Sequence, residues 1–97
     1  MLLEAVVACA GVTLGAVATA MGVTMSGGRV VAEGVWDARG TLGVDRSAPV
    51  GLTEVTLSFE IDSDADAAKL DRMIQTTERY CVILQTLRTP PVITLRR

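Results

Sequence analysis

The sequence contains no histidine, one lysine and only two cysteines among its 97 residues. Without histidine, the chain alone cannot form the Cys-His or Ser-His pairs that activate many catalytic nucleophiles. Cys9 and Cys81 stand near opposite ends of the sequence and supply too few of the usual ligands for a structural zinc site. We therefore expect this protein to use neither a metal ion nor an organic cofactor.

Charge is also sparse, with a formal net charge of −2. The arginines are scattered, so the sequence lacks the basic cluster that binds nucleic-acid phosphates, and Arg96 and Arg97 alone are too few to bind anionic lipid. Asp62, Asp64 and Asp66 alternate as in part of a calcium loop, but the glycine and the distal glutamate of such a loop are missing. We expect no nucleic-acid partner, and we expect these aspartates to serve in capping the next helix.

Aromatic side chains are few, namely Trp36, Phe59 and Tyr80, although 49% of the residues are hydrophobic. A chain of this length forms at most one small domain, here residues 1–97, and buries a modest fraction of its surface. Oligomerisation would compensate for so small a core.

Residues 2–25 carry a single charge, Glu4, and are long enough to span a bilayer. A membrane anchor is therefore one alternative. However, no basic residues precede the apolar stretch, as they do in a secretion signal, and it is rich in Ala, Gly and Thr rather than in the large residues that drive insertion. We favour a soluble helix over residues 2–21 that is buried on most sides, in a cytoplasmic protein with no membrane partner.

Two strands joined by a polar connection are expected next. Gly27-Gly28 is a turn signal, and residues 29–37 follow it as a strand. Residues 38–51 form a polar connection that contains several glycines. Residues 53–61 alternate between apolar and polar side chains, which indicates a strand with one buried face.

A second helix and a third strand complete the pattern. Ser63 or Asp64 is expected to cap the helix, Pro90 and Pro91 end the helical region, and residues 92–95 form a short edge strand. The apolar side of this helix carries Ala67, Leu70, Ile74, Cys81 and Leu84. The order helix, strand, strand, helix, strand predicts an α+β fold with a small antiparallel sheet packed on helices.

Each cysteine lies on the apolar face of a predicted helix. Cys9 shares its face with Ala5, Val12 and Thr13, which are three or four residues away. Free cysteines in such positions usually only contribute to packing. Two helices that bury these faces against each other would nevertheless bring the thiols together.

The sequence segments around the cysteines are a more specific indication of function than the cysteines alone. In chain order, the relevant segments are LLEAVVAC at residues 2–9, VWDARGTLG at residues 35–43 with a D-x-R-G-x-L-G pattern, Val50-Gly51-Leu52 before the alternating strand, and ERYCV at residues 78–82 followed by Thr86-Leu87. Together and in this order, these segments resemble the OsmC/Ohr family, which comprises osmotically inducible and organic-hydroperoxide-resistance proteins.

The resemblance implies an OsmC-like fold and an intertwined homodimer, or a higher homo-oligomer, with active sites at the subunit interface. It also implies a thiol-dependent peroxidase that reduces organic hydroperoxides or hydrogen peroxide. Cys9 would be the peroxidatic cysteine that is oxidised to a sulfenic acid. Cys81 would be the resolving cysteine, forming a disulfide that a cellular dithiol reduces. A transient disulfide of this kind is compatible with a cytoplasmic location.

The sequence departs from the family pattern in two respects. Family members have an amino-terminal β-segment before the first cysteine helix, which supplies the arginine and glutamate that hold the thiolate, whereas this sequence begins at the helix. In addition, Cys81 precedes Val82, where many members have proline. Arg39, Arg79 and Arg88 are candidates to replace the activating arginine. The alternative function is therefore that of a weakly active or inactive OsmC-like protein with a structural or interaction role.

Overall fold

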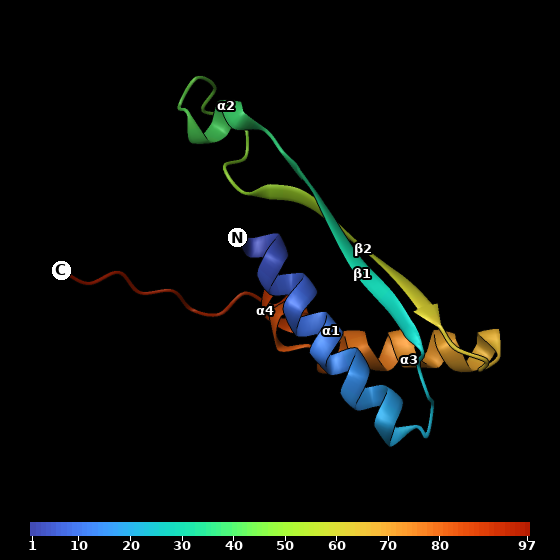
Figure 1. The fold of residues 1–97 in the computed structure, drawn as a ribbon. Helices are drawn as coiled ribbons and strands as arrows, with labels where there is room; N and C mark the ends of the chain where they lie inside the picture. The colour runs from blue at the N-terminus through green and yellow to red at the C-terminus, as the bar shows by residue number, and fades with distance from the viewer.

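The computed structural model describes all 97 residues, and Figure 1 shows how its elements are arranged. In chain order they are α1 (Leu2–Ala20), β1 (Gly27–Trp36), α2 (Ala38–Thr41), β2 (Leu52–Asp62), α3 (Ala67–Tyr80) and α4 (Val82–Arg88). The two strands form a small antiparallel sheet. The predicted α+β fold class is confirmed.

Helix α1 is the centre of the packing. It contacts α3, α4 and β1, and its buried side chains are Val6, Ala10, Leu14, Val17 and Ala18. By length and composition alone α1 is also suited to crossing a membrane, and only 28% of its most apolar 18-residue stretch is buried. The expectation of a helix buried on most sides was therefore wrong for the single chain, because α3, α4 and β1 cover only part of its surface.

The two strands form a long hairpin that is only partly supported by the helices (Figure 1). Near its open end, Phe59 and Ile61 pack against a buried cluster from α1 and α3 that consists of Leu14, Val17, Ala18 and Met73. Towards the tip, Val35 and Trp36 are exposed. The apolar face predicted for residues 53–61 is therefore covered over its second half and bare over its first.

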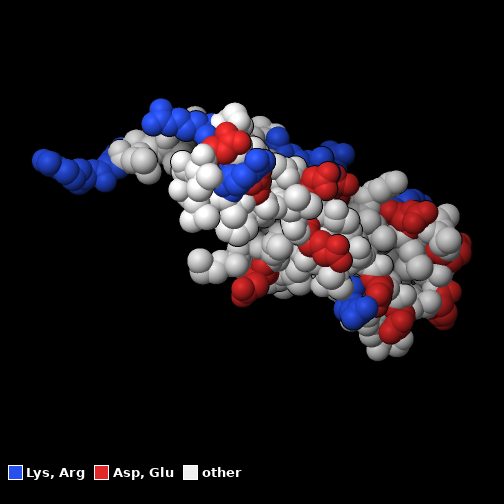
Figure 2. Space-filling view, turned by 90° about the horizontal axis from the view of Figure 1, so that it is seen from above, with Lys and Arg blue, Asp and Glu red and all other residues white.

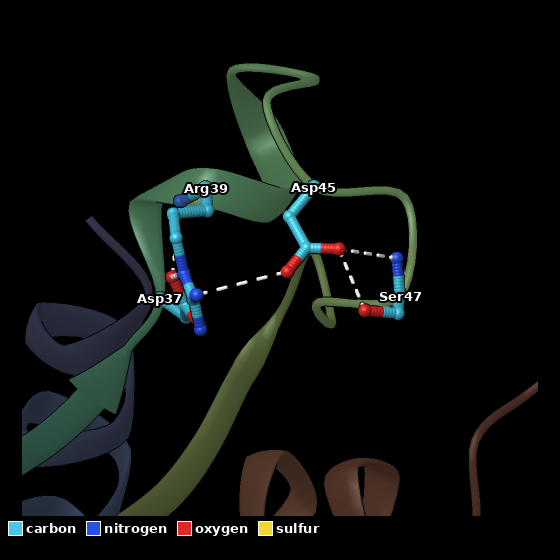
Figure 3. A network of polar contacts seen from close by, with 4 residues as sticks. All are labelled: Asp37, Arg39, Asp45 and Ser47. Atoms are coloured by element: carbon cyan, nitrogen blue, oxygen red, sulfur yellow. Dashed lines mark hydrogen bonds and ion pairs between the residues drawn. The ribbon is translucent and has the colours of Figure 1, made fainter.

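The connection between the strands is a structured tip that projects beyond the helices (Figure 1). Asp37 caps α2 by accepting a hydrogen bond from the Arg39 backbone N–H at 3.0 Å, and the Arg39 guanidinium donates back to the Asp37 carboxylate at 2.8 Å. Figure 3 shows that Arg39 also reaches Asp45, at 3.6 Å, and that Asp45 accepts two hydrogen bonds from Ser47. These contacts fix the shape of a segment that the sequence indicated only as a polar connection.

The cap of α3 differs from the expected one. Asp66 is the N-cap, and its carboxylate accepts a hydrogen bond from the Lys69 backbone N–H at 2.8 Å. The prediction of Ser63 or Asp64 was wrong because the helix begins only at Ala67, which places Asp66 at the capping position.

Two further expectations about the carboxyl-terminal part were wrong. The second helix is interrupted at Cys81, which has φ −74° and ψ 113°, so that Leu84 belongs to the separate helix α4. Residues 92–95 form no strand. Pro90 and Pro91 lead the chain away from the sheet as an extended, exposed tail (Figure 1).

Candidate active site

The two cysteines are in contact although they are far apart in the sequence. The Cys81 thiol donates a hydrogen bond to the Cys9 sulfur, and the two Sγ atoms are 3.2 Å apart. Both cysteines are free thiols. A disulfide bond is about 2.05 Å long, so a small approach of the two sulfurs is enough to form one. The expectation that two helices bring the thiols together is confirmed.

Packing between α1 and α3 creates this contact. Met73, Thr77 and Cys81 are spaced four residues apart on one face, and all three are fully buried. On α1, Val6 and Ala10 beside Cys9 are also fully buried. The Thr77 hydroxyl donates to the Met73 carbonyl at 2.8 Å, so this buried polar group is satisfied. The two apolar faces therefore fix the relative position of the helices and, with it, the position of the sulfurs.

The break at Cys81 directs the start of α4 towards Cys9. The Cys81 backbone N–H donates to the Thr77 carbonyl at 2.9 Å and ends α3, while the Cys81 carbonyl accepts from the Gln85 N–H at 3.0 Å and begins α4. The first N–H groups of a helix have no partner within the helix. Here the N–H groups of Val82 and Ile83 lower the pKa of the Cys9 thiol.

The pKa of the Cys9 thiol is lowered below that of an ordinary thiol. The largest cause is the hydrogen bond from the Ile83 backbone N–H, followed by the hydrogen bond from the Cys81 thiol. The Thr13 hydroxyl contributes further, and partial burial opposes these effects. Because the thiolate is the nucleophilic form of cysteine, the site favours the reactive form of Cys9.

The pKa of the Cys81 thiol is shifted in the opposite direction. Burial is the main cause of its raised pKa, and the neighbouring Cys9 sulfur raises it further, while the Leu84 backbone N–H opposes the shift. Cys81 is 0% exposed, whereas Cys9 is partly exposed. The contact thus joins a partly exposed thiol with a lowered pKa to a buried thiol with a raised pKa.

The three arginines named as possible activators lie elsewhere. Arg39 is in the hairpin tip, Arg79 lies over the neighbouring tyrosine ring, and Arg88 forms an ion pair on α4. None of these guanidinium groups contributes to the lowered pKa of Cys9. The backbone N–H groups of α4 do so instead. The sequence did not indicate these groups, because the helix break at Cys81 is not evident from it.

An open, largely apolar groove of about 740 Å³ lies between β2 and helices α3 and α4. Its walls include Leu57 and Phe59 from the sheet and Ile74, Leu84 and Leu87 from the helices. Neither cysteine lines the groove, but Leu84 is one helical turn from Cys81.

Comparisons with known proteins agree with this fold. A family model described as OsmC-like protein matches residues 1–96. Among solved structures, the crystal structure of an OsmC-like protein from Mycoplasma pneumoniae matches with a TM-score of 0.79 and 25% sequence identity, over 92% of this chain and 60% of that chain. The chain therefore spans less than two thirds of the length of that structure. No curated protein matches the chain.

Alkylation of Cys9 should report the hydrogen bond from Cys81. We expect wild-type Cys9 to reach its half-maximal rate with iodoacetamide at a lower pH than an ordinary thiol, since the thiolate is the reacting form. In Cys81→Ala the donor is lost and the half-maximal pH should rise, by about one unit, since a hydrogen bond to a charged group contributes about 1.5 kcal/mol or more. Mass spectrometry of the Cys9 peptide measures the rate at each pH.

The matched control for this experiment is Cys81→Ser, which retains a hydroxyl donor and should shift the profile less than Cys81→Ala. Identical profiles in all three proteins would show that Cys81 has no influence on the Cys9 thiolate.

Proposed function

Because this chain belongs to the family of OsmC-like proteins, which is generally linked to peroxide and stress responses, we propose that it reduces hydroperoxides with the thiols of Cys9 and Cys81. The observation that carries the proposal is the 3.2 Å contact between the two sulfurs. The opposite shifts of the two pKa values support the proposed roles, with Cys9 as the peroxidatic cysteine and Cys81 as the resolving one.

In the first step, the Cys9 thiolate attacks one oxygen of the hydroperoxide. An S–O bond forms, the O–O bond breaks, and the alkoxide takes up a proton and leaves as the alcohol. Cys9 is thereby oxidised to a sulfenic acid. Hydrogen bonds from the start of α4 stabilise the thiolate before the attack and require no charged side chain.

In the second step, the Cys81 sulfur attacks the sulfur of the sulfenic acid. The disulfide forms, and the hydroxyl group leaves with the Cys81 proton as water. The Cys9 thiolate raises the pKa of Cys81 through its charge, and this effect ends when Cys9 becomes a neutral sulfenic acid. Cys81 therefore loses its proton more easily at the stage when the reaction requires it.

A cellular dithiol completes the cycle by supplying two electrons and two protons. Since Cys81 is fully buried and Cys9 is partly exposed, the first thiolate of the reductant attacks the Cys9 sulfur and releases Cys81. This step needs a reducing compartment, and we therefore propose a cytoplasmic location.

The surroundings of Cys9 favour organic hydroperoxides over hydrogen peroxide. Val12 lies one turn beyond Cys9 on α1, Val82 follows Cys81, and both side chains are exposed. An alkyl or aryl group of the substrate would remove these apolar surfaces from water as it binds. The apolar groove beside α4 offers further surface of the same kind.

Stopped-flow consumption of cumene hydroperoxide in the presence of a dithiol tests the proposed activity. We expect Cys9→Ser to abolish turnover, and Cys81→Ser to allow one oxidation of Cys9 without disulfide formation. Turnover that survives Cys9→Ser would rule out the assigned nucleophile. A wild-type rate no faster than that of free cysteine would instead favour the weakly active or structural OsmC-like protein.

We also propose that the chain functions as a homodimer or a higher homo-oligomer. Only 8 of its 97 residues are buried, and its accessible surface of 7230 Å² is about 1,900 Å² larger than expected for a compact monomer of this mass. Its radius of gyration of 16.6 Å likewise exceeds the value of about 13 Å for a compact chain of this length. A stable interface needs about 800 Å² per partner, so the excess surface is sufficient for one.

The parts that project from the helices are the best candidates for the interface. The hairpin tip exposes Leu42 and Val44, and the tail exposes Val92 and Leu95. In the view of Figure 2, residues other than Lys, Arg, Asp and Glu make up most of the surface. A second copy that covers these apolar side chains would support both segments.

Light scattering after size-exclusion chromatography measures the assembly. We expect a mass of at least twice the 10.2 kDa of the chain. The double variant Leu42→Glu/Val44→Glu should reduce this mass, because it places charges on the apolar tip. The control Thr56→Glu puts a charge on an exposed strand position and should leave the mass unchanged. A monomer at micromolar concentration in the wild type would contradict the proposal.

A further inference from the structure

Side chains of α4 bind the end of α3 across the bend at Cys81. The Gln85 side-chain amide donates a hydrogen bond to the Glu78 backbone carbonyl at 2.7 Å. The Arg88 guanidinium forms an ion pair with the Glu78 carboxylate. Glu78 is therefore bound twice by α4, through its backbone and through its side chain. We call these three residues, Glu78, Gln85 and Arg88, the Glu78 clamp.

The clamp spans the only non-helical residue between the two helices. Cys81 is both the last hydrogen-bonded residue of α3 and the N-cap of α4, so a rotation of its backbone would swing α4 relative to α3. Helix α4 comprises seven residues, which is too short to be stable by itself in water. Beyond Arg88 the chain continues into the exposed tail, which gives α4 no support from that side.

We propose that the Glu78 clamp is a positioning device for the cysteine pair: by fixing the bend at Cys81, it holds the Cys81 sulfur and the first turn of α4 against the Cys9 sulfur. The proposal rests on the function proposed above. Glu78, Gln85 and Arg88 do not touch either sulfur, so they act through the position of α4 and are positioning residues rather than catalytic ones.

The effect of the clamp on reactivity is separable from its effect on global stability. The Arg88 and Glu78 side chains are exposed to 64% and 45%, and an exposed ion pair contributes little to the stability of a fold. Around the Cys9 sulfur, the groups that shift its titration are the Cys81 thiol, the Thr13 hydroxyl and the N–H groups at the start of α4, with no charged side chain among them. A looser bend at Cys81 would therefore change the reactivity of Cys9 by moving its hydrogen-bond donors away from the sulfur.

Neutralising Glu78 gives a test in which the two possible effects have opposite signs. Loss of a negative charge, acting through space alone, would favour the Cys9 thiolate and move its alkylation profile to lower pH. Loss of the clamp removes hydrogen bonds from the thiolate and moves the profile to higher pH. We expect Glu78→Gln to move the half-maximal pH of Cys9 alkylation upwards and to lower the rate at neutral pH by about two- to fivefold, the range that an exposed ion pair can supply.

Three further variants make the result specific. Glu60→Gln breaks the matching exposed Arg29–Glu60 ion pair on the hairpin and should leave the Cys9 profile unchanged. The charge-reversed double variant Glu78→Arg/Arg88→Glu restores an ion pair and should restore the profile. Gln85→Ala removes the other half of the clamp without a change of charge and should shift the profile in the same direction as Glu78→Gln.

The thermal midpoint of each variant shows that it is folded. A Glu78→Gln profile that is unchanged or moves to lower pH overturns the proposal, as does an equal upward shift in the Glu60→Gln control. Alkylation requires no peroxide, so these results are independent of the cumene hydroperoxide assay. If Glu78→Gln shifts the alkylation profile upwards but the wild-type protein does not turn over peroxide, the proposed function is refuted and the positioning of Cys9 by the clamp still stands.

Discussion

The contact between the Cys9 and Cys81 sulfurs is the interaction on which the proposed chemistry depends. It exists because two buried helix faces, one on α1 and one on α3, can pack only in an arrangement that brings these side chains together. Met73 and Thr77 precede Cys81 at four-residue intervals and continue the same buried face. The residues that fill this core therefore also determine the geometry of the site.

The two cysteine side chains are chemically identical, and their different surroundings shift their pKa values in opposite directions. Cys9 is partly exposed and accepts hydrogen bonds, which favours its charged form, whereas Cys81 is buried, which favours its neutral form. In the proposed mechanism, this difference lets the Cys9 sulfur attack the peroxide while the Cys81 sulfur remains beside it as a thiol. The donors to Cys9 include backbone N–H groups, so the thiolate gains stabilisation even though no arginine lies beside it in this chain. The start of helix α4, which follows Cys81, thus lowers the pKa of Cys9.

The helices and strands were predictable from the sequence where the pattern of apolar and polar residues is local and strong. The apolar stretch of α1 and the alternation in β2 identified these elements, and the faces of Cys9 and Cys81 suggested their proximity. The break at Cys81 was missed because neither glycine nor proline marks it, and the hydrogen-bond donors of α4 were missed with it. Residues 92–95 were predicted to form a short edge strand, but a strand also needs a free sheet edge within reach, which local sequence does not specify. The ordered tip depends on contacts of Arg39 with two carboxylates, which composition alone did not reveal.

The most direct test of the central claim is the mass of the protein after reaction with one equivalent of cumene hydroperoxide. If the sulfurs are in contact and Cys9 is the nucleophile, the intact chain loses the mass of two hydrogen atoms, and peptide mapping finds a single disulfide between Cys9 and Cys81. A chain that gains oxygen on Cys9 while Cys81 stays a free thiol would contradict the account, because it would show that the second sulfur does not reach the first.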